Sequence, residues 1–336
     1  MARETAVALV GSETLLGREI RDVATTSEAG FGLRLIAADE KRTGTLTSVG
    51  DEIALTGALN SDSFSGVSAV FLAGSAASSN RALQLAREEP GLAVIDLTFV
   101  AEDRPDARLR APQVEGDIGE TGREAAHVVA HPAAIALALF LRRLHAHYPI
   151  RRSVILALAP ASEQGLAGLE ELQQQTIHLL SFKSLPQQVF DAQIGFNLLP
   201  KYGEEAPAAL EETELRIERH LATLLGLPGE GSNAPMPSLR VIQAPVFHGY
   251  SFSAWVEFEE NPGVESLENS LAVEGIEVRG ADTEPPTNVG QAGSGGIAIG
   301  GIAPDRNEAE ACWFWIVADN LRVTAENAVE VAKQML

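Results

Sequence analysis

The stretch Trp315-Ile-Val-Ala-Asp-Asn-Leu-Arg322, continued by Val323-Thr-Ala-Glu-Asn-Ala-Val-Glu-Val-Ala332, lies near the end of the chain. Its first four residues are apolar and predict a buried strand. The next two, Asp319 and Asn320, can cap a helix because their side chains accept hydrogen bonds from free backbone amides. Apolar residues then repeat at helical spacing: Leu321, Ala325, Ala328, Val329 and Ala332. The stretch therefore predicts a buried strand, a capping turn and a closing helix.

Composition limits the class of protein. A chain of 336 residues that is 45% hydrophobic is long enough for about two domains. The single cysteine excludes an intramolecular disulfide framework. A net charge of −21 argues against a nucleic-acid partner, which is usually bound by clustered Lys and Arg. The apolar run at the N-terminus is too short for a secretion signal or a membrane span, so we expect a cytoplasmic protein with no membrane partner.

The first 130 residues alternate short apolar runs with helical patterns, which is typical of a doubly wound parallel sheet of the Rossmann-like kind. Helices are predicted near Leu15 to Ala24 and Asn80 to Glu88. The predicted strands are Thr5 to Val10, Leu33 to Ala37, Ala69 to Ala73, Ala93 to Leu97 and Val128 to Ala130.

After Pro132 the pattern changes to a long apolar helix, Ala133 to Leu144, and then to longer strands. Those strands are Ser153 to Ala159, Leu239 to Val246, Ser251 to Phe258 and Cys312 to Val317. Helical patterns at Leu166 to Leu180 and Ala208 to Leu225 would cover one face of the sheet that these strands form. We therefore expect a second domain of the α+β class with a large mixed sheet.

The turn Gly11-Ser-Glu-Thr-Leu-Leu-Gly17 follows the first strand and opens a helix. A dinucleotide-binding fold places its diphosphate against helix N-terminal amides at this point. Gly11, Thr14, Leu15 and Gly17 are therefore candidate cofactor residues, although a plain strand-to-helix turn would look the same. Thr14 stands where such loops often have a glycine, so its side chain either crowds the diphosphate or donates a hydroxyl to it.

Charged residues follow the second strand. Asp39 and Glu40 would suit a ribose diol, whereas Lys41 and Arg42 would suit a 2′-phosphate. The sequence does not choose between NAD and NADP.

The C-terminal stretch closely resembles the signature of the aspartate-semialdehyde dehydrogenase family, in which a strand ends in Asp-Asn-Leu-Arg and a helix docks back beside the cofactor. The loop Leu72-Ala-Gly-Ser-Ala-Ala-Ser78 resembles a Ser-Ala-Gly-Gly loop of that family, which adds Gly74 and Ser75 to the cofactor candidates. Asn320 matches an asparagine that reaches the nicotinamide. The resemblance implies NAD or NADP as cofactor, a homodimer, and a C-terminal helix that returns to the first domain.

The implied domains are a dinucleotide-binding domain at 1–132, completed by 319–336, and a dimerisation domain at 133–318. The family's chemistry needs a thiolate nucleophile, a histidine that moves a proton and an arginine that holds the substrate. Ala134 stands at the nucleophile position in a segment that resembles Ala-Asn-Pro-x-Cys-Thr. Gln243 and Tyr250 stand at the arginine and histidine positions of a segment that resembles Arg-Val-Pro-Val-x-x-Gly-His-Ser.

Other cationic positions are also changed. The segment Ile95 to Glu102 lacks the family's phosphate arginine, Glu214 falls where a lysine is usual, and Gly300-Gly-Ile-Ala303 replaces a Gly-Arg-Ile-Arg run. The lone thiol, Cys312, lies in an apolar run that is typical of a buried strand. His131 and His248 could titrate in a cleft, but hydrogen-bonded or exposed histidines are commoner, and no metal-ligand spacing is present.

The chain thus resembles the catalytically degenerate Usg-type paralogues of the family. We expect a homodimer, with NAD or NADP bound weakly or lost, that lacks aspartate-semialdehyde dehydrogenase activity and acts as a binding or partner protein, a pseudoenzyme. Two alternatives stay open. One is an NAD(P)-dependent semialdehyde oxidoreductase of amino-acid biosynthesis with an altered mechanism, and the other is a small-molecule sensor.

Overall fold

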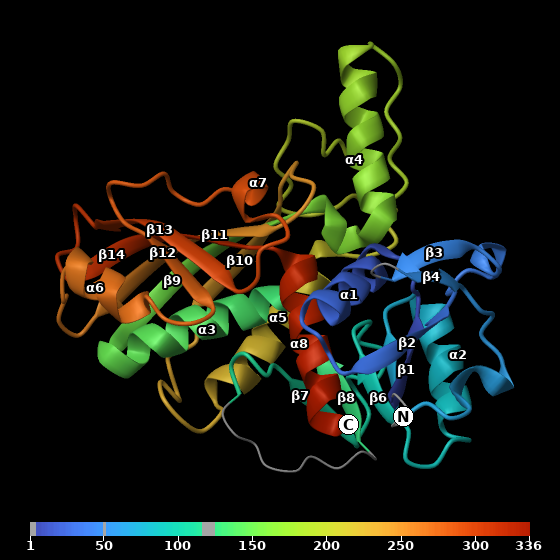
Figure 1. The fold of residues 1–336 in the computed structure, drawn as a ribbon. Helices are drawn as coiled ribbons and strands as arrows, with labels where there is room; N and C mark the ends of the chain where they lie inside the picture. The colour runs from blue at the N-terminus through green and yellow to red at the C-terminus, as the bar shows by residue number, and fades with distance from the viewer. Residues whose placement is uncertain (1–4, 50–51, 116–124) are drawn as a thin grey trace. The chain divides into compact units, whose positions relative to one another are not determined.

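The computed structural model describes residues 5–49, 52–115 and 125–336, so residues 1–4 at the start of the N-terminal apolar run lie outside it. The chain divides into two compact units. Unit 1 is Met1–Ala130 with Thr324–Leu336, and unit 2 is His131–Val323. Figure 1 labels their elements, and each unit is described by itself.

Unit 1 contains a six-stranded sheet in the order β2-β1-β5-β6-β8-β7, with every neighbouring pair parallel. The strands are β1 (Thr5–Val10), β2 (Phe31–Ile36), β5 (Ala69–Leu72), β6 (Ala93–Asp96), β7 (Ala107–Arg110) and β8 (Ala126–Val129). Between β2 and β5 in the chain, β3 (Leu46–Val49) and β4 (Glu52–Leu55) form a separate antiparallel hairpin. Because β1 lies between β2 and β5, the strand order reverses there, which confirms the predicted doubly wound, Rossmann-like sheet.

The helices of unit 1 are α1 (Leu15–Thr26) and α2 (Ala76–Ala86), with short 3-10 turns η1 (Glu40–Arg42) and η2 (Ser61–Phe64). The sequence prediction for α2, Asn80 to Glu88, was wrong at its start. Ser75 and Ser78 form a capping box, each side chain bonding the other's backbone amide, so the helix begins one residue after Ser75.

Unit 2 contains a mixed sheet in the order β10-β9-β11-β14-β13-β12, which confirms the predicted α+β class with a large mixed sheet. The strands are β9 (Ile150–Ala159), β10 (Ser238–Gln243), β11 (Tyr250–Phe258), β12 (Ile276–Arg279), β13 (Ile297–Pro304) and β14 (Ala311–Ala318). The sequence prediction missed β12 and β13. In β13, Gly300 and Gly301 break the apolar alternation, and the pairing of this strand with β14 shifts register between Gly300 and Ala303.

The helices of unit 2 are α3 (Pro132–His147), α4 (Gly165–Leu180), α5 (Leu210–Leu225), α6 (Val264–Leu271) and α7 (Asn288–Gln291), with the 3-10 turn η3 (Ala161–Gln164). Helix α3 lies along the sheet with α5 and α6 beside it, as Figure 1 shows. Its Phe140 ring meets Phe314 of β14 edge-on, 5.0 Å between centroids, at the centre of the buried face.

The other face of this sheet keeps large apolar side chains in contact with solvent. Val154 of β9 is 51% exposed and Trp313 of β14 is 43% exposed. Trp255 of β11 lies between them and pairs in register with each. The indole N–H groups of Trp255 and Trp313 both donate to Oδ2 of Asp305, at 3.0 and 2.7 Å. The ladder of β9, β11 and β14 therefore presents an ordered aromatic surface.

Helix α4 extends beyond the rest of unit 2 (Figure 1) and fixes the irregular segment that follows it. The Glu171 carboxylate accepts hydrogen bonds from the backbone amides of Gln188, Val189 and Phe190. The Phe190 ring then packs edge-on against Tyr202, 5.2 Å away. A buried carboxylate on α4 thus positions the segment that carries Tyr202.

The last helix, α8 (Asn320–Met335), begins in unit 2 and ends in unit 1. Asp319 is its cap, because Oδ1 accepts the amides of Leu321 and Arg322 at 2.9 and 3.1 Å. The predicted strand, cap and helix are therefore present. In the described part of the chain, no helix has both the length and the apolar character needed to cross a membrane.

Candidate functional site

The Gly11–Gly17 turn connects β1 to α1 in unit 1. Gly11 has a φ of +91°, and a Cβ there would overlap the backbone of Gly74 in the β5–α2 loop. A Cβ on Gly17 would overlap the carbonyl oxygen of Gly11. Both glycines thus allow the close backbone approach that a dinucleotide loop requires, and the loops after β1 and β5 meet at the sheet edge where such folds bind ligands.

Thr14 is the N-cap of α1, and Leu15 is the first helical residue. The Thr14 hydroxyl accepts a hydrogen bond from the Gly17 amide at 2.9 Å and lies 2.9 and 2.8 Å from the carbonyl oxygens of Gly11 and Ala73. The side chain therefore uses one of the amides that would face a diphosphate. It also joins the turn to the β5–α2 loop.

The residues after β2 and β5 are placed as follows. Lys41 and Arg42 lie exposed in η1, whose cap is the Asp39 carboxylate, and Glu40 pairs with Arg81 on the surface. Ser75 caps α2, directly after Gly74. Unit 1 thus brings most of the predicted cofactor residues to one edge of its sheet, whereas Asn320 belongs to unit 2.

Ala134 is the third residue of α3, which begins at Pro132. Its methyl group is fully buried and carries no nucleophile. The only thiol of the chain, Cys312, is also buried, in β14, and burial raises its pKa above the ordinary value. Neither position offers a thiolate, the form of sulfur that attacks carbonyls.

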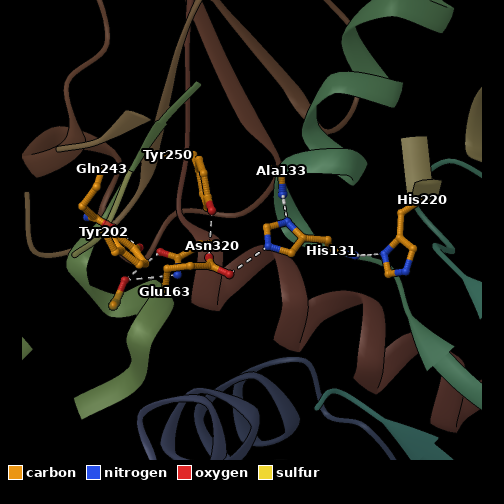
Figure 2. A network of polar contacts seen from close by, with 9 residues as sticks. His131, Ala133, Glu163, Tyr202, His220, Gln243, Tyr250 and Asn320 are labelled. Carbon is orange, nitrogen blue, oxygen red and sulfur yellow. Dashed lines mark hydrogen bonds and ion pairs between the residues drawn. The ribbon is translucent and has the colours of Figure 1, made fainter. Parts of the chain in front are cut away.

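A carboxylate that is 14% exposed, that of Glu163, joins several polar side chains of unit 2 (Figure 2). Glu163, in η3, accepts a hydrogen bond from Nε2 of His131 at 2.9 Å and another from the Tyr250 hydroxyl at 2.9 Å. The Ala133 amide donates to Nδ1 of His131, so the proton on this ring that faces Glu163 is on Nε2. Both oxygens of the carboxylate are thereby committed, one to an imidazole and one to a phenol.

The ionisation of this cluster follows from its surroundings. Burial alone would raise the pKa of Glu163, but interaction with His131, the hydrogen bonds from His131 and Tyr250, and attraction to Arg216 hold it below its ordinary value. Burial, and then the Glu163 charge, raise the pKa of Tyr250 well above that of a free phenol. Tyr250 therefore stays protonated and directs its proton to Glu163.

Gln243, at the end of β10, is fully buried and fully hydrogen-bonded. Its amide donates to the carbonyl oxygens of Ala159 and Ala244, and its oxygen accepts the Tyr202 hydroxyl at 2.7 Å. Burial, followed by the charge of Glu163, raises the pKa of Tyr202. The sequence resemblance predicts that Gln243 stands where the family has an arginine. The side chain there is a neutral amide whose donors are both used.

Asn320 lies beside this cluster within unit 2. Its Oδ1 accepts the Gly249 amide at 3.0 Å, and its Nδ2 is 3.1 Å from the Ser162 hydroxyl. His220 accepts the His131 amide through Nδ1, at 2.9 Å (Figure 2). Every polar side chain of the cluster is therefore held by protein groups.

Three further positions have structural roles. Glu214 accepts the Val241 amide at 2.7 Å and so ties α5 to β10. Asp96 is buried and accepts the amides of Thr98 and Ala101, and burial raises its pKa. Gly300 packs where a Cβ would collide with Pro286. No three His, Cys, Asp or Glu residues of the described ranges are grouped so that they could hold a metal ion.

No sequence pattern singled out four further residues of this cluster, Glu163, Tyr202, Ser162 and His220. The available signal for Glu163 was a lone acidic residue in Ala161-Ser-Glu-Gln-Gly165, a small-residue segment between a buried strand and a helix. Its partners are 32 and 87 residues away in the chain. Only the pairing of β9 with β11 brings the end of one strand beside the start of the other.

Comparison with known proteins identifies similar chains. The family model for the semialdehyde dehydrogenase dimerisation domain matches residues 141–323. A USG-1 protein homolog of Pseudomonas aeruginosa is 30% identical over 346 residues, covering 100% of this chain and 99% of that protein. An aspartate-semialdehyde dehydrogenase of Rickettsia bellii is 26% identical over 350 residues, with coverage of 100% and 99%. The solved structure of a probable aspartate-semialdehyde dehydrogenase from Pseudomonas aeruginosa superposes with a TM-score of 0.83 at 26% identity, covering 98% of each chain.

Proposed function

Because this chain belongs to the semialdehyde dehydrogenase family, we propose that it keeps the family's scaffold but does not carry out the aspartate-semialdehyde dehydrogenase reaction. The observation that supports this most strongly is the Glu163 cluster. A general base must be free to take a proton from the reacting group. Here Nε2 of His131 and the Tyr250 hydroxyl both direct their protons to one carboxylate, and the pKa of that carboxylate is lowered.

Two further features support the proposal. Ala134 supplies no atom that can form a covalent bond to an aldehyde carbon. Gln243 supplies no positive charge for a substrate carboxylate, and its own donors are used by Ala159 and Ala244. If Ala134, Tyr250 and Gln243 stand at the family positions that the sequence predicts, nucleophile, base and anchor are absent together, which fits a binding protein rather than a slow enzyme.

The test is a steady-state assay in both directions. Purified protein is mixed with aspartate semialdehyde, phosphate and NAD or NADP, and reduced cofactor is followed by absorbance; aspartyl phosphate with reduced cofactor tests the reverse reaction. We expect rates at the level of the protein-free control. Steady turnover above that control that falls in the milder variant Tyr250→Phe would refute the proposal.

We propose that the dinucleotide site of unit 1 is retained and binds NAD or NADP weakly. The glycine contacts of Gly11 and Gly17 fit a dinucleotide loop, but Thr14 already uses the Gly17 amide. We expect dissociation constants in the high micromolar range, about 6 kcal/mol or less of binding free energy. When bound, the cofactor would contribute recognition, since no residue described above prepares a substrate for hydride transfer.

We propose that the protein is a homodimer through the open face of the unit 2 sheet. The family model that matches is a dimerisation domain, and the face carries Val154, Trp255 and Trp313 in one ladder. Exposed apolar surfaces of this kind are usually covered by a partner. We expect light scattering at low micromolar concentration to give twice the 35.6 kDa of one chain.

The variant Trp313→Glu places a charge in the centre of this face and should shift the mass toward the monomer. Leu180→Glu is a matched control, because Leu180 is 72% exposed at the end of α4, away from the sheet. A wild-type mass near 35.6 kDa would contradict the proposal.

A further inference from the structure

Glu13 is the third residue of the Gly11–Gly17 turn, and its carboxylate reaches the end of β2. Its Oε1 accepts the backbone amides of Ala38 and Asp39 at 2.8 and 2.9 Å. Its Oε2 is buried and has no hydrogen-bond partner among the described residues. A buried carboxylate oxygen without a donor is costly, and because the Glu13 side chain is only partly buried, a rotation of the carboxylate can turn this oxygen toward a ligand hydroxyl.

The end of β2 is where dinucleotide folds distinguish their two cofactors. An acidic side chain there accepts the adenosine ribose 2′-hydroxyl of NAD, whereas cationic groups and free amides hold the 2′-phosphate of NADP. The local amides of Ala38 and Asp39 are already used by Glu13. The Asp39 carboxylate accepts the Lys41 amide at 3.0 Å and so adds a second negative charge beside the same turn.

We propose that Glu13 selects NAD over NADP, with Oε2 accepting a ribose hydroxyl. This inference rests on the proposed dinucleotide site of unit 1. A 2′-phosphate carries more than one negative charge at neutral pH and would meet the partly buried Glu13 carboxylate without a free backbone donor. The charges of Asp39, Lys41 and Arg42 are all exposed and screened by solvent, so the Glu13 carboxylate carries the discrimination.

Isothermal titration calorimetry of NAD and NADP against the full-length protein tests the inference. We expect wild type to bind NAD at least about tenfold more tightly than NADP. Glu13→Gln keeps the side-chain shape and an oxygen for the two amides but removes the charge, so the preference for NAD should fall severalfold. Glu13→Ala also frees both amides, so NADP should bind more tightly than to wild type while NAD binds less tightly.

Thr14→Gly is the matched control on the same turn. Thr14 bonds to Gly17, on the diphosphate side, and not to the end of β2. Its replacement should change NAD and NADP affinity by the same factor and leave their ratio unchanged. Circular dichroism and thermal unfolding of each variant establish that the fold is intact. If Glu13→Ala does not fold, the NAD-to-NADP ratio of Glu13→Gln decides the test. AMP and 2′-AMP, titrated in parallel, should reproduce the ratio.

Equal or tighter binding of NADP by wild type, or an unchanged ratio in Glu13→Gln, would overturn the inference while leaving the proposed lack of turnover intact. No binding of either dinucleotide by wild type or any variant would overturn both the inference and the retained dinucleotide site. The turnover assay does not depend on either result. The two proposals can therefore fail separately.

Discussion

The variant Ala134→Cys will have no aspartate-semialdehyde dehydrogenase turnover above the protein-free control. A thiol at this position would lie in the first turn of α3, where helix amides favour the thiolate. The thiolate would nevertheless lack a base, because His131 and Tyr250 direct their protons to Glu163. Residues that act as a unit lose about six powers of ten in rate when one of them is removed, so restoring one member alone recovers almost nothing.

The control is a thiol titration of the folded variant. Cys312 and position 134 are both fully buried, so neither thiol should react fast in the folded variant, and a fast-reacting thiol is evidence of unfolding that circular dichroism can check. Phosphate-dependent formation of reduced cofactor by the single variant would show that base and anchor are present after all. In that case the assignment of Tyr250 and Gln243 to those positions would be wrong.

The variant Glu163→Ala will lose about 3 kcal/mol of unfolding free energy at pH 7, because it leaves the buried His131 and Tyr250 without their acceptor. Tyr250→Phe is the matched control. It removes one hydrogen bond to the same carboxylate and should cost about 1.5 kcal/mol. Urea unfolding followed by tryptophan fluorescence reports on this unit, since Trp255, Trp313 and Trp315, the chain's three tryptophans, all lie in its sheet.

The effect should depend on pH. The pKa of Glu163 in the folded protein lies below its ordinary value of 4.5, so the ionised form is the one that the fold stabilises. That contribution is complete above pH 4.5 and is lost as the pH falls through the lower, folded-state pKa. The difference between wild type and Glu163→Ala should therefore shrink at pH 3. A difference below 0.5 kcal/mol at pH 7, on the order of an ordinary surface substitution, would contradict the assigned role.

The sequence predicted the fold through local patterns. The Trp315–Arg322 stretch predicted the last strand, its cap and α8, and all three are present: the cap and helix depend on neighbours within four residues, and the strand is a continuous apolar run. The parallel sheet of unit 1 was also predicted, since buried parallel strands are continuous apolar runs. The start of α2 was missed because the reciprocal bonds of Ser75 and Ser78 outweigh the apolar spacing that suggested Asn80.

The candidate site was less predictable. The family positions of Ala134 and Tyr250 stay predictions from motifs, and the partner of Tyr250 could not be predicted at all, because Glu163 is 87 residues away. The role of Glu13 was hidden for the same reason, since its partners Ala38 and Asp39 follow another strand. Side-chain partners across a sheet depend on strand order and register, and a single sequence does not specify either.

The most direct test of the proposed loss of function is the intact mass of the wild-type protein after incubation with aspartate semialdehyde and NADP or NAD, in the absence of phosphate. An acylating dehydrogenase would transfer hydride to the cofactor and retain the aspartyl group on its nucleophile, and without phosphate that group would accumulate. We expect the mass to stay unchanged, while a known aspartate-semialdehyde dehydrogenase treated in parallel gains one aspartyl group. The same gain on this protein, at any residue, would contradict the account.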